Sequence, residues 1–180
     1  MMKRYIGVAV LSVFMACNSS EHSKNAHEDT TVIAADTLAV NNEIQFSEPR
    51  IENILKNYLI LKNTLVSSKE REAQGAAKEL ATALNSYEGC ENTALIADKI
   101  GNTTDIKIQR KEFTALSSDI IALFEHADLK AGFLYVQHCP MANSGNGGDW
   151  ISSEKKIRNP YYGDSMLECG SVLKEIKPKN

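Results

Sequence analysis

Four sulfur-bearing side chains lie in two clusters near the C-terminus. Cys139 and Met141 form the first cluster, with His138 directly before them, and Met166 and Cys169 form the second. Thiolate and thioether sulfurs are soft ligands, and they select soft ions such as Cu(I) and Ag(I). The two methionines are also the only ones after residue 16, and neither falls in the helical region where methionine usually fills the core. The pattern predicts a soft-metal site built from Cys139, Met141, Met166 and Cys169, with His138 as an optional ligand.

The same two cysteines allow a second interpretation, because cysteines of exported proteins commonly pair. A Cys139–Cys169 disulfide would contribute about 3–4 kcal/mol in the chain-entropy model, and it would remove both thiolates. In this alternative the domain is structural, binds no metal, and docks onto an envelope partner through a surface of Trp150, Tyr161 and Tyr162. Both interpretations stay open on spacing alone.

Patterns that indicate catalysis are weak. The chain has no Cys-x-x-Cys of the thioredoxin type. Pro140 directly follows Cys139, and no Asn or Asp can be assigned to orient His126 toward that thiol. The Gly/Asn-rich loop 143–148 lacks the Lys-Ser/Thr ending of a phosphate-binding loop. We therefore expect no enzyme activity and no nucleotide binding, and we interpret Cys90 as a half-buried free thiol.

Helices must position these residues. Apolar residues recur at helical spacing over residues 51–66, with Ser47 as the expected N-cap. Ser67 and Glu70 have capping-box spacing, and the helix they predict carries small alanines on its inner face and ends at Gly89.

Two further helices follow. The first is expected to begin at Asn92 or Thr93 and to end at Gly101, and the second to begin near Thr104 or Asp105. The side chains that the last helix is expected to bury are Ile108, Phe113, Leu116, Ile120, Leu123 and Phe124. From Phe133 to His138 the period changes to two, which predicts a short strand. The expected fold class is mainly α: an antiparallel up-and-down four-helix bundle with a short strand and an irregular C-terminal cap.

The N-terminus has the pattern of an export signal. Lys3 and Arg4 precede an apolar run at 5–16, which is shorter than the roughly 20 residues needed to cross a bilayer as a helix. The sequence Phe14-Met15-Ala16-Cys17 resembles a bacterial lipobox, in which the cysteine receives the lipid. We expect residues 1–16 to be a lipoprotein signal peptide, residues 17–45 to be the lipidated Cys17 with a flexible tether, and residues 46–180 to form the domain. The protein would then be exported and lipid-anchored to an envelope membrane, with the domain in the periplasm.

Composition limits the class of protein further. The chain has 180 residues, of which 43% are hydrophobic, so it has room for one globular domain of ordinary size. Its formal net charge is −3, and no basic field of the kind that binds nucleic acid is present. Nucleic acid is therefore excluded as an expected partner.

Several motifs together are similar to a known family. They are Tyr135 to Ala142, Trp150-Ile151-Ser152, Ile157 to Gly163, Met166 to Gly170, Tyr58-Leu59 and Gln109-Arg110-x-x-Phe113. Over roughly residues 50–176 the chain resembles domain-of-unknown-function family 3347. Members occur as small exported lipoproteins and as an extra domain on membrane-fusion adaptor subunits of copper/silver efflux systems. The resemblance implies heavy-metal handling in the cell envelope, with the membrane and a metal-efflux adaptor or another envelope protein as partners. It makes metal binding as well supported as the disulfide.

Overall fold

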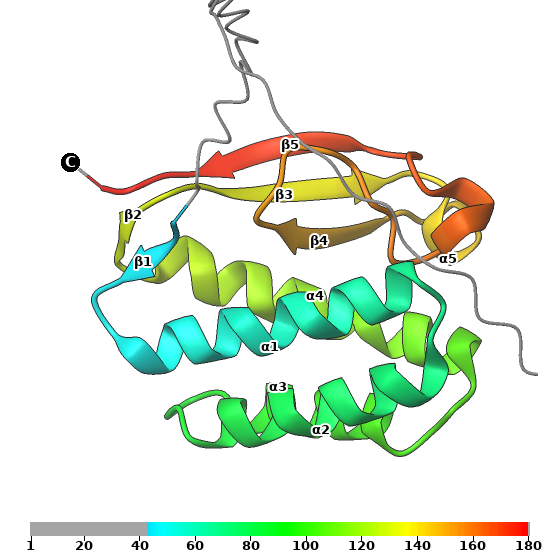
Figure 1. Ribbon diagram of the computed structural model, residues 1–180, viewed down its shortest axis with the longest axis horizontal. Coiled ribbons are helices and arrows are strands. Elements are labelled where there is room, and N and C mark those ends of the chain that lie inside the picture. Colours follow the sequence, from blue (N-terminus) through cyan, green and yellow to red (C-terminus); the bar gives the residue numbers. More distant parts are fainter. Residues whose placement is uncertain (1–42, 180) are drawn as a thin grey trace, which may run out of the picture. The chain divides into compact units, whose positions relative to one another are not determined.

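A computed structural model describes residues 43–179, and four long helices and two small antiparallel sheets make up this part of the chain (Figure 1). In chain order the elements are β1 (Gln45–Phe46), α1 (Pro49–Val66), α2 (Glu70–Asn85), α3 (Glu91–Gly101), α4 (Ile106–His126), β2 (Leu129–Ala131), β3 (Leu134–Cys139), α5 (Ala142–Gly145), β4 (Gly148–Ser152), the 3-10 turn η1 (Gly163–Met166) and β5 (Ser171–Ile176). The predicted mainly helical character is confirmed.

Consecutive helices pack against one another, and α1 runs antiparallel to α4. The strand before α1 pairs with the strand after α4, so the start of α1 lies beside the end of α4. At the opposite end, Arg110 in the second turn of α4 donates to the backbone oxygen of Leu65 near the end of α1, at 2.9 Å. Small alanines on the inner face of α2, among them Ala73 and Ala77, are fully buried. They let the neighbouring helices approach closely, as their spacing predicted.

The C-terminal part forms a three-stranded sheet in the order β4-β3-β5, and this corrects the expectation of one short strand followed by an irregular cap. The paired residues include Val136 with Ile151 and His138 with Ser171. The expected strand is the central one, β3. Its two partners are short or largely exposed, so neither has the sustained apolar alternation that marks a strand in the sequence.

The sheet lies over α1 and α4, and α2 and α3 lie on the far side of these two helices (Figure 1). A series of aromatic rings joins the layers. Tyr58 of α1 stacks on Phe113 of α4 at 5.6 Å, Phe113 meets Tyr161 at 5.8 Å, and Tyr161 meets Trp150 of β4 at 6.1 Å, each measured between ring centroids. Because all four side chains are nearly or fully buried, helices and sheet share one core.

Some helix boundaries differ from the prediction. Glu48 stands at the N-cap of α1, and the Ser47 hydroxyl instead donates to Asp128 at 2.6 Å. Ser67 ends α1 and does not cap α2. Asp105, in contrast, caps α4 as expected, because its carboxylate accepts from the backbone N–H groups of Lys107 and Ile108.

Four of the six side chains that the last helix was predicted to bury are fully buried, and Leu123 is partly buried. Ile108 is 46% exposed and not buried, because the buried face of the first turn of α4 carries Gln109, which is 0% exposed. The predicted signal peptide, the lipid anchor Cys17 and nearly all of the predicted tether fall outside the described residues. Among the helices of residues 43–179, none combines the length and the apolar composition needed to cross a membrane.

Candidate functional site

Cys139 and Cys169 lie next to each other, with their sulfur atoms 3.4 Å apart and not bonded. Cys139 ends the central strand β3 and is fully buried, whereas Cys169 lies just before β5 and is partly exposed. The structure therefore brings together the two thiols that the sequence placed in separate clusters. A pair with one buried and one accessible sulfur can bind an ion that arrives from solvent, or can be oxidised to a disulfide.

The close approach of the second cysteine depends on the glycine that follows it. Gly170 has φ +146°, a conformation that side chains rarely adopt. A Cβ atom there would lie 2.4 Å from the backbone oxygen of His138, a distance shorter than real Cβ atoms show to any neighbouring atom. Any larger residue would push the start of β5 away from β3 and separate the sulfur atoms.

The local environment keeps the accessible thiol protonated. The hydrogen bond with Cys139 raises the pKa of Cys169, and partial burial raises it further. A metal ion must displace the thiol protons before it can bind the thiolates. Metal binding at this pair would therefore release protons and would strengthen as the pH rises.

The two methionines lie in the segments that carry the cysteines. Met166 ends η1, and its backbone oxygen accepts from the N–H of Cys169 at 3.1 Å. Met141 lies in the turn after β3 with a side chain that is 51% exposed, and the Tyr162 hydroxyl holds its backbone oxygen at 2.6 Å. Both thioethers thus belong to the segments that carry the thiols, with Met141 at the surface.

His138 is not brought together with the sulfur atoms. Adjacent residues of a strand point to opposite faces, so His138 points away from the side of β3 that Cys139 occupies. Its Nδ1 atom lies 2.6 Å from Oδ1 of Asp149, the residue paired with it in β4. Within residues 43–179, no group of three or more His, Cys, Asp or Glu side chains is placed to hold a metal ion. The donor atoms that the structure brings together are therefore the two thiols of Cys139 and Cys169.

The proposed aromatic docking surface is not available. Trp150 is fully buried, and Tyr161 is only 6% exposed. The indole nitrogen of Trp150 donates to Gln137 at 2.8 Å, and Tyr161 packs against Phe113 of α4. Only Tyr162 retains partial exposure. These rings anchor the C-terminal segment to the helices, because their apolar area is more stable inside the core than in water.

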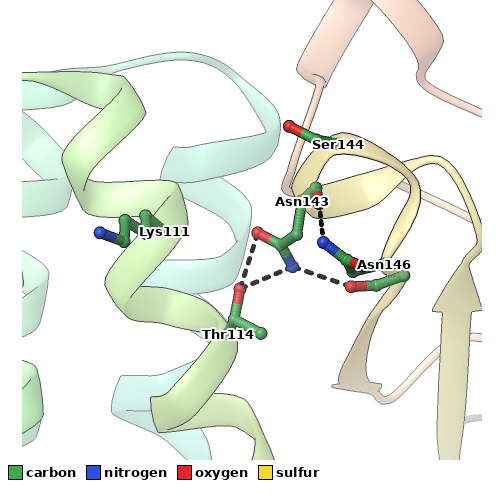
Figure 2. Close-up of a pocket in the computed structure, with 6 residues that line it drawn as sticks. Lys111, Thr114, Asn143, Ser144 and Asn146 are labelled. Atoms are coloured by element: carbon green, nitrogen blue, oxygen red, sulfur yellow. Dashed lines mark hydrogen bonds between the residues drawn. The ribbon is translucent and has the colours of Figure 1, made fainter.

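A cavity of about 630 Å³ lies between α4 and the turn at α5 (Figure 2). Asn143 and Ser144 both adopt left-handed backbone conformations there, with φ values of 52° and 60°. The Asn143 amide nitrogen donates to the hydroxyl of Thr114 at 2.9 Å and to the backbone oxygen of Gly147 at 2.8 Å. Figure 2 shows these polar groups bonded to one another and the Lys111 side chain directed away from them. This turn therefore fastens the loop to α4.

Two motif residues of α4 also have structural partners. The buried amide nitrogen of Gln109 donates to the backbone oxygens of Glu70 and Thr103, at 2.9 and 2.8 Å. Arg110 donates to Leu65 and to Pro160, which joins α1, α4 and the C-terminal segment. Gln109 and Arg110 belong to the sequence motif that carries the family resemblance, and these contacts show that both side chains hold the helices and the C-terminal segment together.

Comparison with known proteins gives one match. The model of a family described as a protein of unknown function, DUF3347, matches residues 54–132. This range covers most of α1 and extends through α4 and β2, and it ends before β3 and the four sulfur residues. Neither the comparison with curated proteins nor the comparison with solved structures found a match. The predicted resemblance to this family is thus confirmed over residues 54–132, the helical part of the chain.

Proposed function

We propose that this domain binds a soft monovalent metal ion, Cu(I) or Ag(I), through the thiolates of Cys139 and Cys169. The observation that carries the proposal is the 3.4 Å approach of two free sulfur atoms that lie far apart in the sequence. Soft thiolates select Cu(I) over the harder divalent ions of the cell. The ion is cargo in this proposal, and the domain acts as a binding module without catalytic activity.

The surroundings of the thiol pair support exchange of the ion with solvent or with a partner. Cys169 is partly exposed, so an ion can reach it without opening the core. The thioether of Met166 belongs to the turn that holds Cys169, and Met141 offers a second thioether at the surface. We assign no metal-binding role to His138, because it lies on the opposite face of β3 and bonds with Asp149.

The place of the domain in the cell belongs to the same proposal. Cys17 would carry the lipid that anchors the chain to an envelope membrane, and residues 18–45 would hold the domain in the periplasm. The four helices would serve as an up-and-down bundle on which the thiol-bearing sheet rests. The partner would be a metal-efflux adaptor or another envelope protein, because members of the family that this chain resembles also occur as an extra domain on such adaptors.

One alternative has the same observation in its favour. Two thiols at 3.4 Å can also be oxidised to a disulfide that fastens β5 to β3. Most of β5 is exposed, and Ile176 is its only buried residue, so apolar packing holds this edge strand weakly. A covalent link at Cys169 would compensate for that weakness, and the domain would then be a structural module without metal.

Cu(I) titration against a competing chelator, combined with mass determination of the untreated protein, separates these functions. We expect free thiols in the exported protein and tight Cu(I) binding that is lost in Cys139→Ser and in Cys169→Ser. Cys90→Ser is the matched control, because Cys90 is also a nearly buried free thiol but lies at the start of α3. A mass two hydrogens lighter together with no Cu(I) binding would establish the disulfide alternative.

A further inference from the structure

Lys62 is a charged residue in the core whose amino group has no hydrogen-bond or ion-pair partner among residues 43–179. It lies in the last third of α1, and only 5% of its surface is exposed. Lysine side chains are almost never buried to this extent unless another group pairs with them. Within residues 43–179, no group makes a hydrogen bond or an ion pair with its amino group. Some other compensation is therefore required for this buried amine.

Lys62 lines a cavity of about 300 Å³. The cavity lies between the end of α1 and the loop after β4, and its polar lining consists of Lys62, Asn63, Ser67, Ser153, Glu154 and Arg158. The only fully occluded polar side-chain atom without a partner in the described chain is Oε1 of Gln109. The Lys62 nitrogen is therefore not sealed in the core, and the cavity that it lines is its route to solvent.

The charges around this cavity are unbalanced toward positive. Arg158 is exposed, and like Lys62 it makes no hydrogen bond or ion pair within the described residues. Glu154 is the only acidic side chain in the lining, and it is exposed. Burial lowers the pKa of Lys62 to about 8, Glu154 opposes this shift, and Arg158 adds to it. Glu154 is thus the one anion in the lining that acts on the ammonium, and it offsets the effect of burial only in part.

We propose that the cavity lined by Lys62 and Arg158 binds a phosphate group. Lys62 would supply a point charge from the floor, and the planar guanidinium of Arg158 would donate two parallel hydrogen bonds to phosphate oxygens. The hydroxyl of Ser67 and the amide of Asn63, both exposed at the rim, would donate to the remaining oxygens. A bound phosphate would offset the unpaired charge that the protein alone leaves in place.

This site is separate from the thiol pair, and its residues do not overlap with Cys139, Met141, Met166 or Cys169. The phosphate group can belong to a free molecule or to the headgroup of an anionic lipid, since both present the same oxygens. The two sources differ in measurement. A free phosphate binds in solution, whereas a lipid headgroup binds only when the protein meets a vesicle.

Calorimetric titration of the full chain tests the proposal, with inorganic phosphate, glycerol phosphate and vesicles of phosphatidylcholine with and without phosphatidic acid as probes. We expect Lys62→Met and Arg158→Gln each to weaken binding by about tenfold or more. Glu154→Gln should strengthen it, because that change removes the only opposing charge in the lining. Lys56→Met is the matched control, since Lys56 is an exposed lysine of the same helix, and its binding should stay unchanged.

A second measurement follows the amine directly. Bound phosphate should raise the pKa of Lys62, as read from the NMR shift of its Cε carbon during a pH titration. Lys62→Met exchanges a buried unpaired charge for an apolar chain of similar length, so the variant should fold. Binding only to phosphatidic acid vesicles identifies a headgroup site, and binding of the soluble probes identifies a free-ligand site. The proposal is overturned if no probe binds, or if Lys56→Met and Lys62→Met weaken binding equally.

Discussion

Replacing Tyr58 by phenylalanine would remove one oxygen atom from the point where α1, α4 and β4 meet. The Tyr58 hydroxyl lies 2.7 Å from the hydroxyl of Ser117 in α4, and it accepts from the backbone N–H of Ile151 in β4 at 3.1 Å. All three residues are fully buried. Burial also raises the pKa of Tyr58, so the hydroxyl stays protonated and can donate to Ser117 while it accepts from Ile151.

The expected cost follows from what each partner loses. The Ile151 N–H would be left in the core without an acceptor, which costs about 1–3 kcal/mol. Ser117 would lose a hydrogen bond, but its hydroxyl can turn to a backbone oxygen one helical turn earlier, so this loss adds about 1 kcal/mol or less. We expect Tyr58→Phe to lower the free energy of unfolding by about 1–4 kcal/mol, with the ring stacking on Phe113 retained.

Urea unfolding of four proteins measures this cost: the wild type, Tyr58→Phe, Ser117→Ala and the double variant. Because the two hydroxyls interact, the double variant should lose less than the sum of the single losses. Tyr135→Phe is the control, since the structure shows no hydrogen bond for that hydroxyl, and its stability should change by less than about 0.5 kcal/mol. A comparably small loss for Tyr58→Phe, or strict additivity with Ser117→Ala, would refute the reasoning.

Two other changes test the packing and the charge described above. Burial lowers the pKa of Lys62 to about 8, so above that pH the unfolded chain binds more protons than the folded one and the wild type becomes more stable as the pH rises. Lys62→Met lacks this titration. The difference in the free energy of unfolding between the variant and the wild type should therefore shrink by about 2 kcal/mol from pH 7 to pH 9.5, as measured by urea titrations without phosphate. Gly148→Ala would place a Cβ atom 2.6 Å from the ring of Tyr161, so thermal unfolding should show a loss of about 1–3 kcal/mol. Gly75→Ala is the control, because a Cβ atom at position 75 would have no atom within 4 Å, and alanine there should stabilise α2 by up to about 1 kcal/mol. The opposite signs would show that the loss in Gly148→Ala is steric and not a general effect of alanine.

The helices could be predicted because their signals are local. Spacing of apolar residues in α1 and the cap at Asp105 depend on neighbours within a few positions, and both predictions hold. The flanking strands β4 and β5 could not be predicted in this way, because they exist through pairing with β3. Their own sequences are too short or too exposed to show the alternation of a buried strand.

The candidate site, too, could be predicted from the sequence only in part. Residue type alone pointed to Cys139 and Cys169, and the sheet register supplies the contact that the sequence left open. The sequence also made His138 a possible ligand because it precedes Cys139. Adjacent residues of a strand face opposite sides, and this rule applies only once β3 is known to be the central strand of a sheet. Lys62 gave no signal, because its burial depends on the loop after β4.

The pairing of the strands also separates the place where the chain enters the domain from the thiol pair. Residues 43 and 44 enter beside β1, and β1 pairs with β2 close to the start of β3. Cys139 is the last residue of β3, so it lies the length of that strand, roughly 17 Å, from the point of entry. An anchor upstream of β1 would therefore hold the domain at the start of β3, whereas the thiols lie at the end of β3. A partner could approach the sulfur pair without contacting the anchored end of the domain. Changing the length of the segment before β1 would alter how far the thiols reach from the anchor, but it would leave the environment of the two thiols unchanged.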